Sequence, residues 1–164
     1  MLNRLRAWYY GAKARSRQAE GRVEDAFRCF MLAAESGSPE YQNEVGARYA
    51  EGLGAPQDHV EALKWYAKAA ESGYPYAQAN IGWVHYKGFG VAQSYAQAFQ
   101  WYLLAANQGH PESEYNIGLM YVDGLGVDAD PDKSRVWLQR AAGHGVAEAR
   151  AVLARMDGVI ETRA

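Results

Sequence analysis

The sequence is poor in cysteine and has no long hydrophobic run. Its 164 residues include a single cysteine, Cys29, which excludes an intramolecular disulfide and fits a small buried hydrophobe. No stretch approaches the roughly 18 consecutive apolar residues of a transmembrane helix. The first ten residues lack the apolar run and the small-residue cleavage site of a signal peptide. We therefore expect a cytoplasmic protein.

A large excess of charge of either sign is also missing. The formal net charge is -2, so nothing in the overall composition favours binding to nucleic acid. The charge is nevertheless unevenly distributed, because residues 1–22 carry six basic side chains and one acidic side chain, Glu20. This basic segment is typical of a solvated helix face, but it also fits contact with a membrane surface or an acidic partner. The basic residues are Arg4, Arg6, Lys13, Arg15, Arg17 and Arg22.

The residue patterns of catalytic and metal sites are absent as well. The four histidines form no i, i+4 pair and no HExxH motif, and the one cysteine has no evident activating partner. The Gly-x-Gly turns lack the third glycine of a dinucleotide fingerprint. Asp128, Asp130 and Asp132 resemble the start of an EF-hand loop, but Lys133 occupies its glycine position. We expect no catalytic residue, no metal and no cofactor.

What the sequence does contain is a period of 36 residues. The same step carries Gly46 to Gly82 and Gly118, and Trp65 to Trp101 and Trp137. A period shared by unlike residue types is typical of a repeat array, in which stacked neighbours bury a common core. The step also relates four copies of an Ala-Ala-x-x-Gly tail, which end at Gly37, Gly73, Gly109 and Gly145.

Each repeat reads as a helix, a turn and a second helix. In residues 39–72, apolar spacings of three and four predict a first helix, here called helix A, that ends near Gly52. The turn is followed by Asp58, whose counterparts Ser94 and Asp130 are also good N-cap residues for the second helix, helix B. The predicted fold class is therefore all-α, an α-solenoid of helix-turn-helix repeats.

These repeats predict one solenoid domain over residues 1–164. An atypical N-terminal capping unit covers 1–36, and a capping helix and a tail close the other end. The full set of expected segments is 1–36, three 36-residue repeats over 37–72, 73–108 and 109–144, a helix over 145–157 and a tail over 158–164.

The third repeat carries a recognisable motif. Tyr115, Gly118, Tyr121, Gly124 and Gly126, followed by the Trp137 and Ala-Ala-x-x-Gly positions, closely resemble the Sel-one-like repeat of the tetratricopeptide-like superfamily. The resemblance implies a right-handed, tetratricopeptide-like superhelix that serves as an adaptor or scaffold, commonly in bacterial signalling, envelope assembly or host interaction. The paired cysteines of one branch of this family are absent, so its penicillin-binding activity is not carried over.

Candidate binding residues are those that the repeat tolerates but does not require. Trp65, Trp101 and Trp137 are required and predict core packing, whereas Trp83 has Ala47 and Leu119 as its counterparts. In the resembling fold, helix A lines the concave face. Trp83 then either belongs to an exposed aromatic strip or packs between repeats. The candidate partner-binding residues are Tyr76, Asn80, Trp83, Tyr86, Lys87, Tyr115, Asn116 and Leu119.

Three functional hypotheses follow. The first is a non-enzymatic adaptor that binds a peptide or partner protein on its concave helix-A face, with Asn80 and Asn116 either contacting the peptide backbone or serving a structural role. The second is a peripheral membrane or envelope-assembly component anchored by the basic N-terminal helix. The third is a hydrolase-type enzyme built across the groove. The aromatic strip is also compatible with a homodimer.

Overall fold

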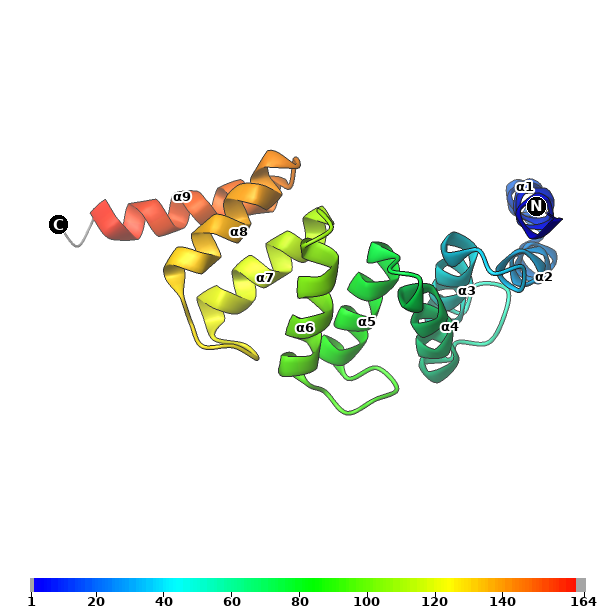
Figure 1. Ribbon diagram of the computed structural model, residues 1–164, viewed down its shortest axis with the longest axis horizontal. Helices are drawn as coiled ribbons and strands as arrows, with labels where there is room; N and C mark the ends of the chain where they lie inside the picture. The colour runs from blue at the N-terminus through cyan, green and yellow to red at the C-terminus, as the bar shows by residue number, and fades with distance from the viewer. Residues whose placement is uncertain (1, 162–164) are drawn as a thin grey trace. The chain divides into compact units, whose positions relative to one another are not determined.

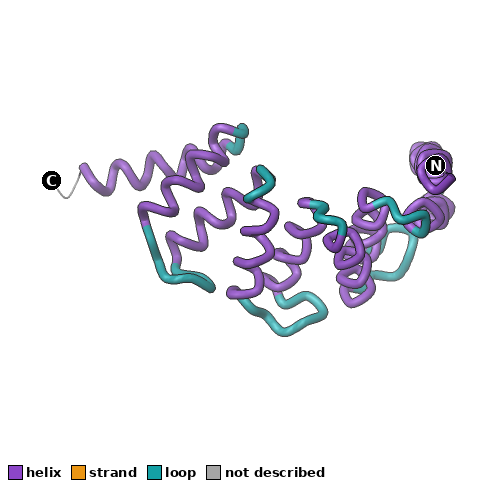
Figure 2. Tube along the Cα trace, in the orientation of Figure 1, coloured by secondary structure: helices purple, strands orange, loops and turns teal. Residues whose placement is uncertain are grey.

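The computed structural model describes residues 2–161, with side chains up to Gly158, and all regular secondary structure in this part of the chain is α-helical. Figures 1 and 2 show helices joined by loops and turns, with no strand in the described part. This confirms the predicted all-α repeat fold. The helices are α1 (Leu2–Ala19), α2 (Val23–Ala34), α3 (Pro39–Glu51), α4 (His59–Glu71), α5 (Pro75–Lys87), α6 (Tyr95–Ala106), α7 (Pro111–Asp123), α8 (Pro131–Gly143) and α9 (Ala147–Glu161).

The chain divides after Gln93 into two compact units. Unit 1 contains α1 to α5, and unit 2 contains α6 to α9. The division falls in the loop between α5 and α6, inside the repeat that the sequence predicts over 73–108. The sequence predicts a single solenoid domain, because the 36-residue period runs through this loop.

In unit 1, α1 packs through small side chains. Ala7, Gly11 and Ala14 are the buried residues of α1. A Cβ atom on Gly11 would lie only 1.9 Å from the hydroxyl oxygen of Tyr41 on α3, so the tyrosine occupies the space that a larger residue would need. The small face of α1 thus fixes which side of this helix is buried.

The two helices of a hairpin approach closely at a glycine of helix A. A Cβ on Gly46 of α3 would lie 2.6 Å from the Tyr66 ring of α4. A Cβ on Gly118 of α7 would lie 2.7 Å from the Leu138 side chain of α8, which is fully buried. The recurring glycine is therefore required by helix packing, and it accepts either an aromatic or a leucine partner.

The predicted N-caps of the B helices are confirmed. The Asp58 side chain accepts hydrogen bonds from the backbone N–H groups of Val60 and Glu61. Ser94 and Asp130 accept from the third residue of their own helices. These caps satisfy amide groups that have no partner inside the helix and so mark where each B helix begins.

The long loop of each repeat rests on the preceding helix B. A Cβ on Gly54 would lie 2.6 Å from the carbonyl oxygen of Val23, the first residue of α2. In unit 2, a Cβ on Gly126 would lie 2.3 Å from the Tyr95 carbonyl at the start of α6. Both glycines also have positive φ, 83° and 73°, so close approach and backbone conformation each favour glycine.

The last helix is longer than predicted. The helix expected over 145–157 is observed as Ala147–Glu161, so it continues through the first part of the predicted tail, and 162–164 lie outside the described residues. Ala149 and Val152 of its predicted apolar stripe are buried. The exposed side chains of α9 include Arg150, Arg155 and Asp157.

Candidate functional site

Four residues of α5 form what we call the α5 aromatic surface: Tyr76, Trp83, Tyr86 and Lys87. Trp83 is 46% exposed and stacks on Tyr86, with ring centroids 6.1 Å apart and planes 5° apart. The ammonium nitrogen of Lys87 lies 4.5 Å from the Trp83 ring centroid and 5.7 Å from that of Tyr86. The side chains thus present stacked aromatic faces beside a cation, an arrangement suited to apolar and aromatic ligand groups.

The other end of this surface lies close to acidic side chains of α3. The Tyr76 side chain is 54% exposed, and its ring centroid lies 5.5 Å from that of Tyr74. Burial raises the pKa of the Tyr74 hydroxyl, and the charges of Glu40 and Glu44 raise it further. The α5 aromatic surface therefore runs from a lysine at its C-terminal end to a negatively charged region at its N-terminal end.

Asn80 links α5 to α3. Its side-chain amide donates a 2.8 Å hydrogen bond to the side-chain oxygen of Asn43. This supports the structural reading of Asn80 over the peptide-binding reading, because the amide group is already used inside unit 1. Within unit 1 the structure therefore places Tyr76, Trp83, Tyr86 and Lys87 on one surface and gives Asn80 a role beside them.

The remaining predicted residues lie on α7 in unit 2. Tyr115 and Leu119 are partly buried and pack against the core of Leu138 and its neighbours. Tyr115 and Asn116 also line a recess of about 610 Å³ at the turn before α9. The eight predicted residues are thus divided between the two units, and a single site made of all eight stays a prediction.

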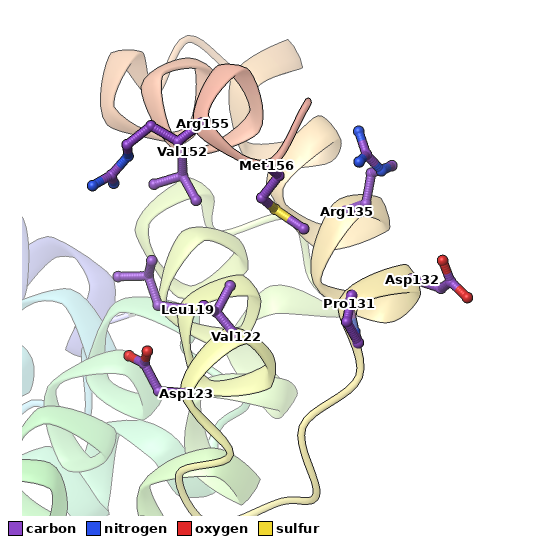
Figure 3. Close-up of a pocket in the computed structure, with 9 residues that line it drawn as sticks. All are labelled: Leu119, Val122, Asp123, Pro131, Asp132, Arg135, Val152, Arg155 and Met156. Carbon is purple, nitrogen blue, oxygen red and sulfur yellow. The ribbon is translucent and has the colours of Figure 1, made fainter. Parts of the chain in front are cut away.

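Unit 2 also contains a groove of about 600 Å³ between α7, α8 and α9 (Figure 3). The side chains of Leu119 and Val122 on α7 face Val152 and Met156 on α9 and give the groove an apolar floor. Charged residues of both signs surround this floor, and Arg135 forms an ion pair with Asp157. The charged lining residues are Asp123, Asp132, Arg135 and Arg155.

Sequence reasoning found one wall of this groove and missed the other. Leu119, on helix A of the third repeat, was among the candidate partner-binding residues. One further step of 36 residues carries Leu119 to Arg155, which lies on α9, so the period itself contained the missing signal. This helix was predicted only as a cap, so no binding position was expected on it.

A buried carboxylate joins α7 to α8. Glu114 is fully buried, and its two oxygens lie 2.8 Å from an Arg140 guanidinium nitrogen and 2.7 Å from Nδ1 of His144. A carboxylate beside a histidine is also found in acid–base catalysis. Here Arg140 compensates the buried charge, so the cluster acts as an ion-paired link between the two helices.

Other reactive side chains have structural environments. Cys29 is buried in the core of unit 1 as a free thiol, as the sequence predicts. His110 caps α7, and burial lowers the pKa of its imidazole. Within residues 2–161, no group of three or more His, Cys, Asp or Glu side chains is arranged to hold a metal ion.

Comparison with known proteins finds a repeat of the same 36-residue length. The family model described as the Sel1 repeat matches residues 39–74, 75–110 and 111–146, two residues later than the predicted repeats. A Sel1 repeat protein from Oxalobacter formigenes is 32% identical with a TM-score of 0.78, over 85% of this chain and 56% of its own. No curated protein matches the chain.

A second solved structure is c5321, a protective antigen of uropathogenic Escherichia coli strains that displays an SLR fold. It is 31% identical with a TM-score of 0.81, over 87% of this chain and 32% of its own length. The present chain thus spans little more than half of one of these two relatives and about a third of the other. Cysteine rich protein B of Helicobacter pylori, 18% identical with a TM-score of 0.56 over 58% of this chain and 73% of its own, shares the fold.

Proposed function

The chain belongs to the Sel1 repeat family, and from this premise we propose that it is an adaptor that binds a partner protein through the α5 aromatic surface. Sel1 repeat proteins are generally protein-interaction scaffolds, and the family is generally non-catalytic. The observation that carries the proposal is the exposed stack of Trp83 on Tyr86 beside Lys87.

The internal alignment supports this assignment. Ala47 and Leu119 occupy the Trp83 position in the neighbouring repeats, so the fold does not need an indole there. An exposed tryptophan is costly to keep in water and is strongly enriched among the residues that dominate binding at protein interfaces. Trp83 is accordingly the residue of α5 that we expect to contribute most to binding.

The charges around the surface indicate the chemistry of the partner. Glu40 and Glu44 act on Tyr74 at one end, so a basic side chain of the partner is favoured there. The Trp83 and Tyr86 rings suit an apolar or aromatic anchor. We expect an extended or helical segment that carries both, with an affinity in the micromolar range, about 8 kcal/mol.

Protein capture tests the proposal. Wild-type protein, Trp83→Ala and Leu104→Ala are immobilised, exposed to a lysate of the cells that make the protein, and the retained proteins are identified by mass spectrometry. Leu104, on helix α6, is the matched control because its side chain is 49% exposed, close to the 46% of Trp83. We expect a partner held by wild type and Leu104→Ala and released from Trp83→Ala, with a loss of about 2 kcal/mol, or roughly 30-fold in affinity.

Two controls test whether a loss of binding in Trp83→Ala comes from the α5 aromatic surface. Circular dichroism and thermal melting of Trp83→Ala should match wild type, because a collapse in stability would place Trp83 in the core and remove the basis of the proposal. Val122→Glu changes the groove of unit 2 at a 42% exposed position. If this variant loses the partner and Trp83→Ala keeps it, binding occurs in the groove and the assignment to α5 is wrong.

A further inference from the structure

Helix α1 has an apolar face that is exposed in the part of the chain that the structure describes. Leu2, Leu5, Trp8 and Tyr9 are 83%, 60%, 68% and 54% exposed. At 3.6 residues per turn they lie within about a third of the helix circumference. The opposite side of α1 is the small-residue face of Ala7, Gly11 and Ala14 that packs inside unit 1. We call the four exposed residues the α1 outer face.

Basic side chains border this face on both sides. The helical spacing places Arg4 and Arg15 along one edge and Arg6 and Lys13 along the other, and all four residues are exposed. None of the ion pairs observed within residues 2–161 involves these four side chains. The ion pairs of Arg17 and Arg22 with Glu20 lie at the C-terminal end of α1, near the α1–α2 turn.

The remaining contacts of these basic groups are weak or local. Arg15 donates a hydrogen bond to the Tyr41 hydroxyl, while Arg6 lies over the Tyr10 ring and Lys13 over the Tyr9 ring. The sequence of α1 contains no acidic residue. The helix therefore presents an apolar centre between two positive edges, with no negative charge of its own to neutralise them.

We propose that α1 binds the surface of an anionic lipid bilayer and lies in the plane of the membrane interface. Leucine and tryptophan side chains enter the boundary between headgroups and acyl chains, and tyrosine suits the same depth. Long lysine and arginine side chains on the two edges reach the lipid phosphates while their apolar stems stay near the acyl chains. No helix among residues 2–161 combines the length and apolar character needed to cross a lipid bilayer.

Charge favours an anionic lipid bilayer over a second copy of the chain as the binding partner of the α1 outer face. A symmetric contact between two α1 outer faces would bring the positive edges of both helices together, and like charges facing each other are unfavourable. A bilayer rich in anionic headgroups offers the opposite charge on both edges at once. The proposal is independent of the partner surface on α5.

Vesicle flotation tests the proposal with the full chain. Wild-type protein is mixed with vesicles of phosphatidylcholine alone or with one quarter phosphatidylglycerol, at low salt and at about 0.5 M NaCl. We expect binding only to the anionic vesicles, reduced at least about tenfold by the added salt. Leu5→Glu with Trp8→Glu should abolish binding by breaking the apolar centre, and Arg4→Glu with Arg6→Glu should weaken it about tenfold or more.

Two further arms assign any binding to this face. Val136→Glu on α8, at a 56% exposed position, is the matched control and should bind vesicles as wild type does. Vesicles with brominated acyl chains should quench part of the tryptophan emission of wild type. The quenched part should be smaller in Trp8→Phe, which keeps an apolar ring at this position. Equal binding to neutral vesicles, no binding to either kind, or binding unchanged by the α1 variants would overturn the proposal. So would a wild-type dimer that Leu5→Glu with Trp8→Glu dissociates, because a second copy would then cover the face.

Discussion

At the scale of single residues, His110 shows how burial can make stability depend on pH. Its imidazole caps α7, accepts a 3.2 Å hydrogen bond from the backbone N–H of Ser113, and lies 3.0 Å from the Ser113 hydroxyl. Burial lowers the pKa of His110 below its ordinary 6.5, although the charges of Glu112 and Glu114 act in the opposite direction. Burial also lowers the pKa of His85.

This lowered pKa predicts a loss of stability in weak acid. Below pH 6.5 the unfolded chain binds a proton at this position more readily than the folded chain does. The contribution of neutral His110 to stability is therefore complete above pH 6.5 and is lost as the pH falls through the folded-state pKa. We expect His110→Asn, which keeps a capping side chain but cannot titrate, to lose less stability between pH 7.5 and pH 5 than wild type.

Urea unfolding at the two pH values measures the effect. The comparison is between the falls in unfolding free energy of the two proteins, so the fixed effect of the substitution on stability cancels. Carboxylates with lowered pKa, such as Asp130, titrate below this window. Identical pH dependence in both proteins would show that His110 is not a source of the acid sensitivity.

Residue-level prediction from the sequence succeeded only in part, even at the tryptophan positions that the repeat requires. Trp65 is buried as predicted, but its counterparts Trp101 and Trp137 are only half-buried, and the Arg140 guanidinium lies 4.4 Å from the Trp137 ring centroid. The period shows that a position prefers an indole and says nothing about which neighbour covers it. The bond between Asn80 and Asn43 was likewise unpredictable, because the partners are 37 residues apart and occupy different positions in the repeat.

At the scale of helices, helix A and helix B of one hairpin can pack closely only because a glycine of helix A has no side chain. Gly118 lets α7 approach α8 until the Leu138 side chain fills the space of a Cβ atom. Leu138 is fully buried, so it has little freedom to move away. Gly143 lies at the end of α8, where an added Cβ would meet no atom within 4 Å.

The two glycines predict opposite effects of the same substitution. Gly118→Ala should destabilise the protein by about 1 to 3 kcal/mol, because the new methyl group overfills the contact with Leu138. Gly143→Ala should leave stability unchanged or raise it by up to about 1 kcal/mol, because alanine favours the helix and adds no clash. Chemical denaturation of both variants checks the difference. Equal effects of the two substitutions would mean that the helix contact does not determine the need for glycine.

Most helix boundaries could be predicted because their signals are local. A cap or a turn involves residues next to one another in sequence, so Asp58 and Gly52 indicated the correct ends. The end of α9 was predicted at 157, just before Gly158, but one glycine costs a helix only about 1 kcal/mol and does not stop it.

At the scale of the whole molecule, the division into two units suggests that stability is local. Repeat proteins gain stability from neighbouring repeats, so damage in one place need not weaken the whole chain equally. The buried Glu114 link between α7 and α8 offers a way to weaken unit 2 alone. Glu112, two residues away, is exposed and provides the matched control.

We expect Glu114→Ala to lower the opening free energy of unit 2 by about 2 kcal/mol and to leave unit 1 nearly unchanged. Removing one member of a buried ion pair usually costs more than this, but Arg140 and His144 are 42% and 48% exposed and can regain water. Hydrogen exchange read by mass spectrometry should show roughly 30-fold faster exchange in α7 and α8. A Glu112→Ala control should exchange as wild type does. Equal acceleration in α2 and α3 would show instead that the chain unfolds as one cooperative unit.

The sequence identified single candidate residues, but it did not show which surfaces these residues form in the folded protein. The period identified Trp83 as a residue that the fold does not require, and its exposure agrees with that reading. The groove on unit 2 depends on α9 facing α7 across the start of α8, which is a tertiary arrangement. The small residues of α1 indicate its buried side, but the contact with Tyr41 of α3 is a tertiary arrangement that the sequence of α1 does not give.

The loops that rest on the preceding B helix also determine where the chain tolerates insertions. Long surface loops are usually the safest places for added sequence, but here Gly54 and Gly126 touch backbone of the previous repeat and leave no room. The short turns between repeats are the opposite case, because a Cβ on Gly37 or Gly73 would meet nothing within 4 Å. An epitope tag, a fluorescent domain or new termini are therefore better placed next to Gly37 or Gly73 than in the long loops, with these two positive-φ glycines themselves kept.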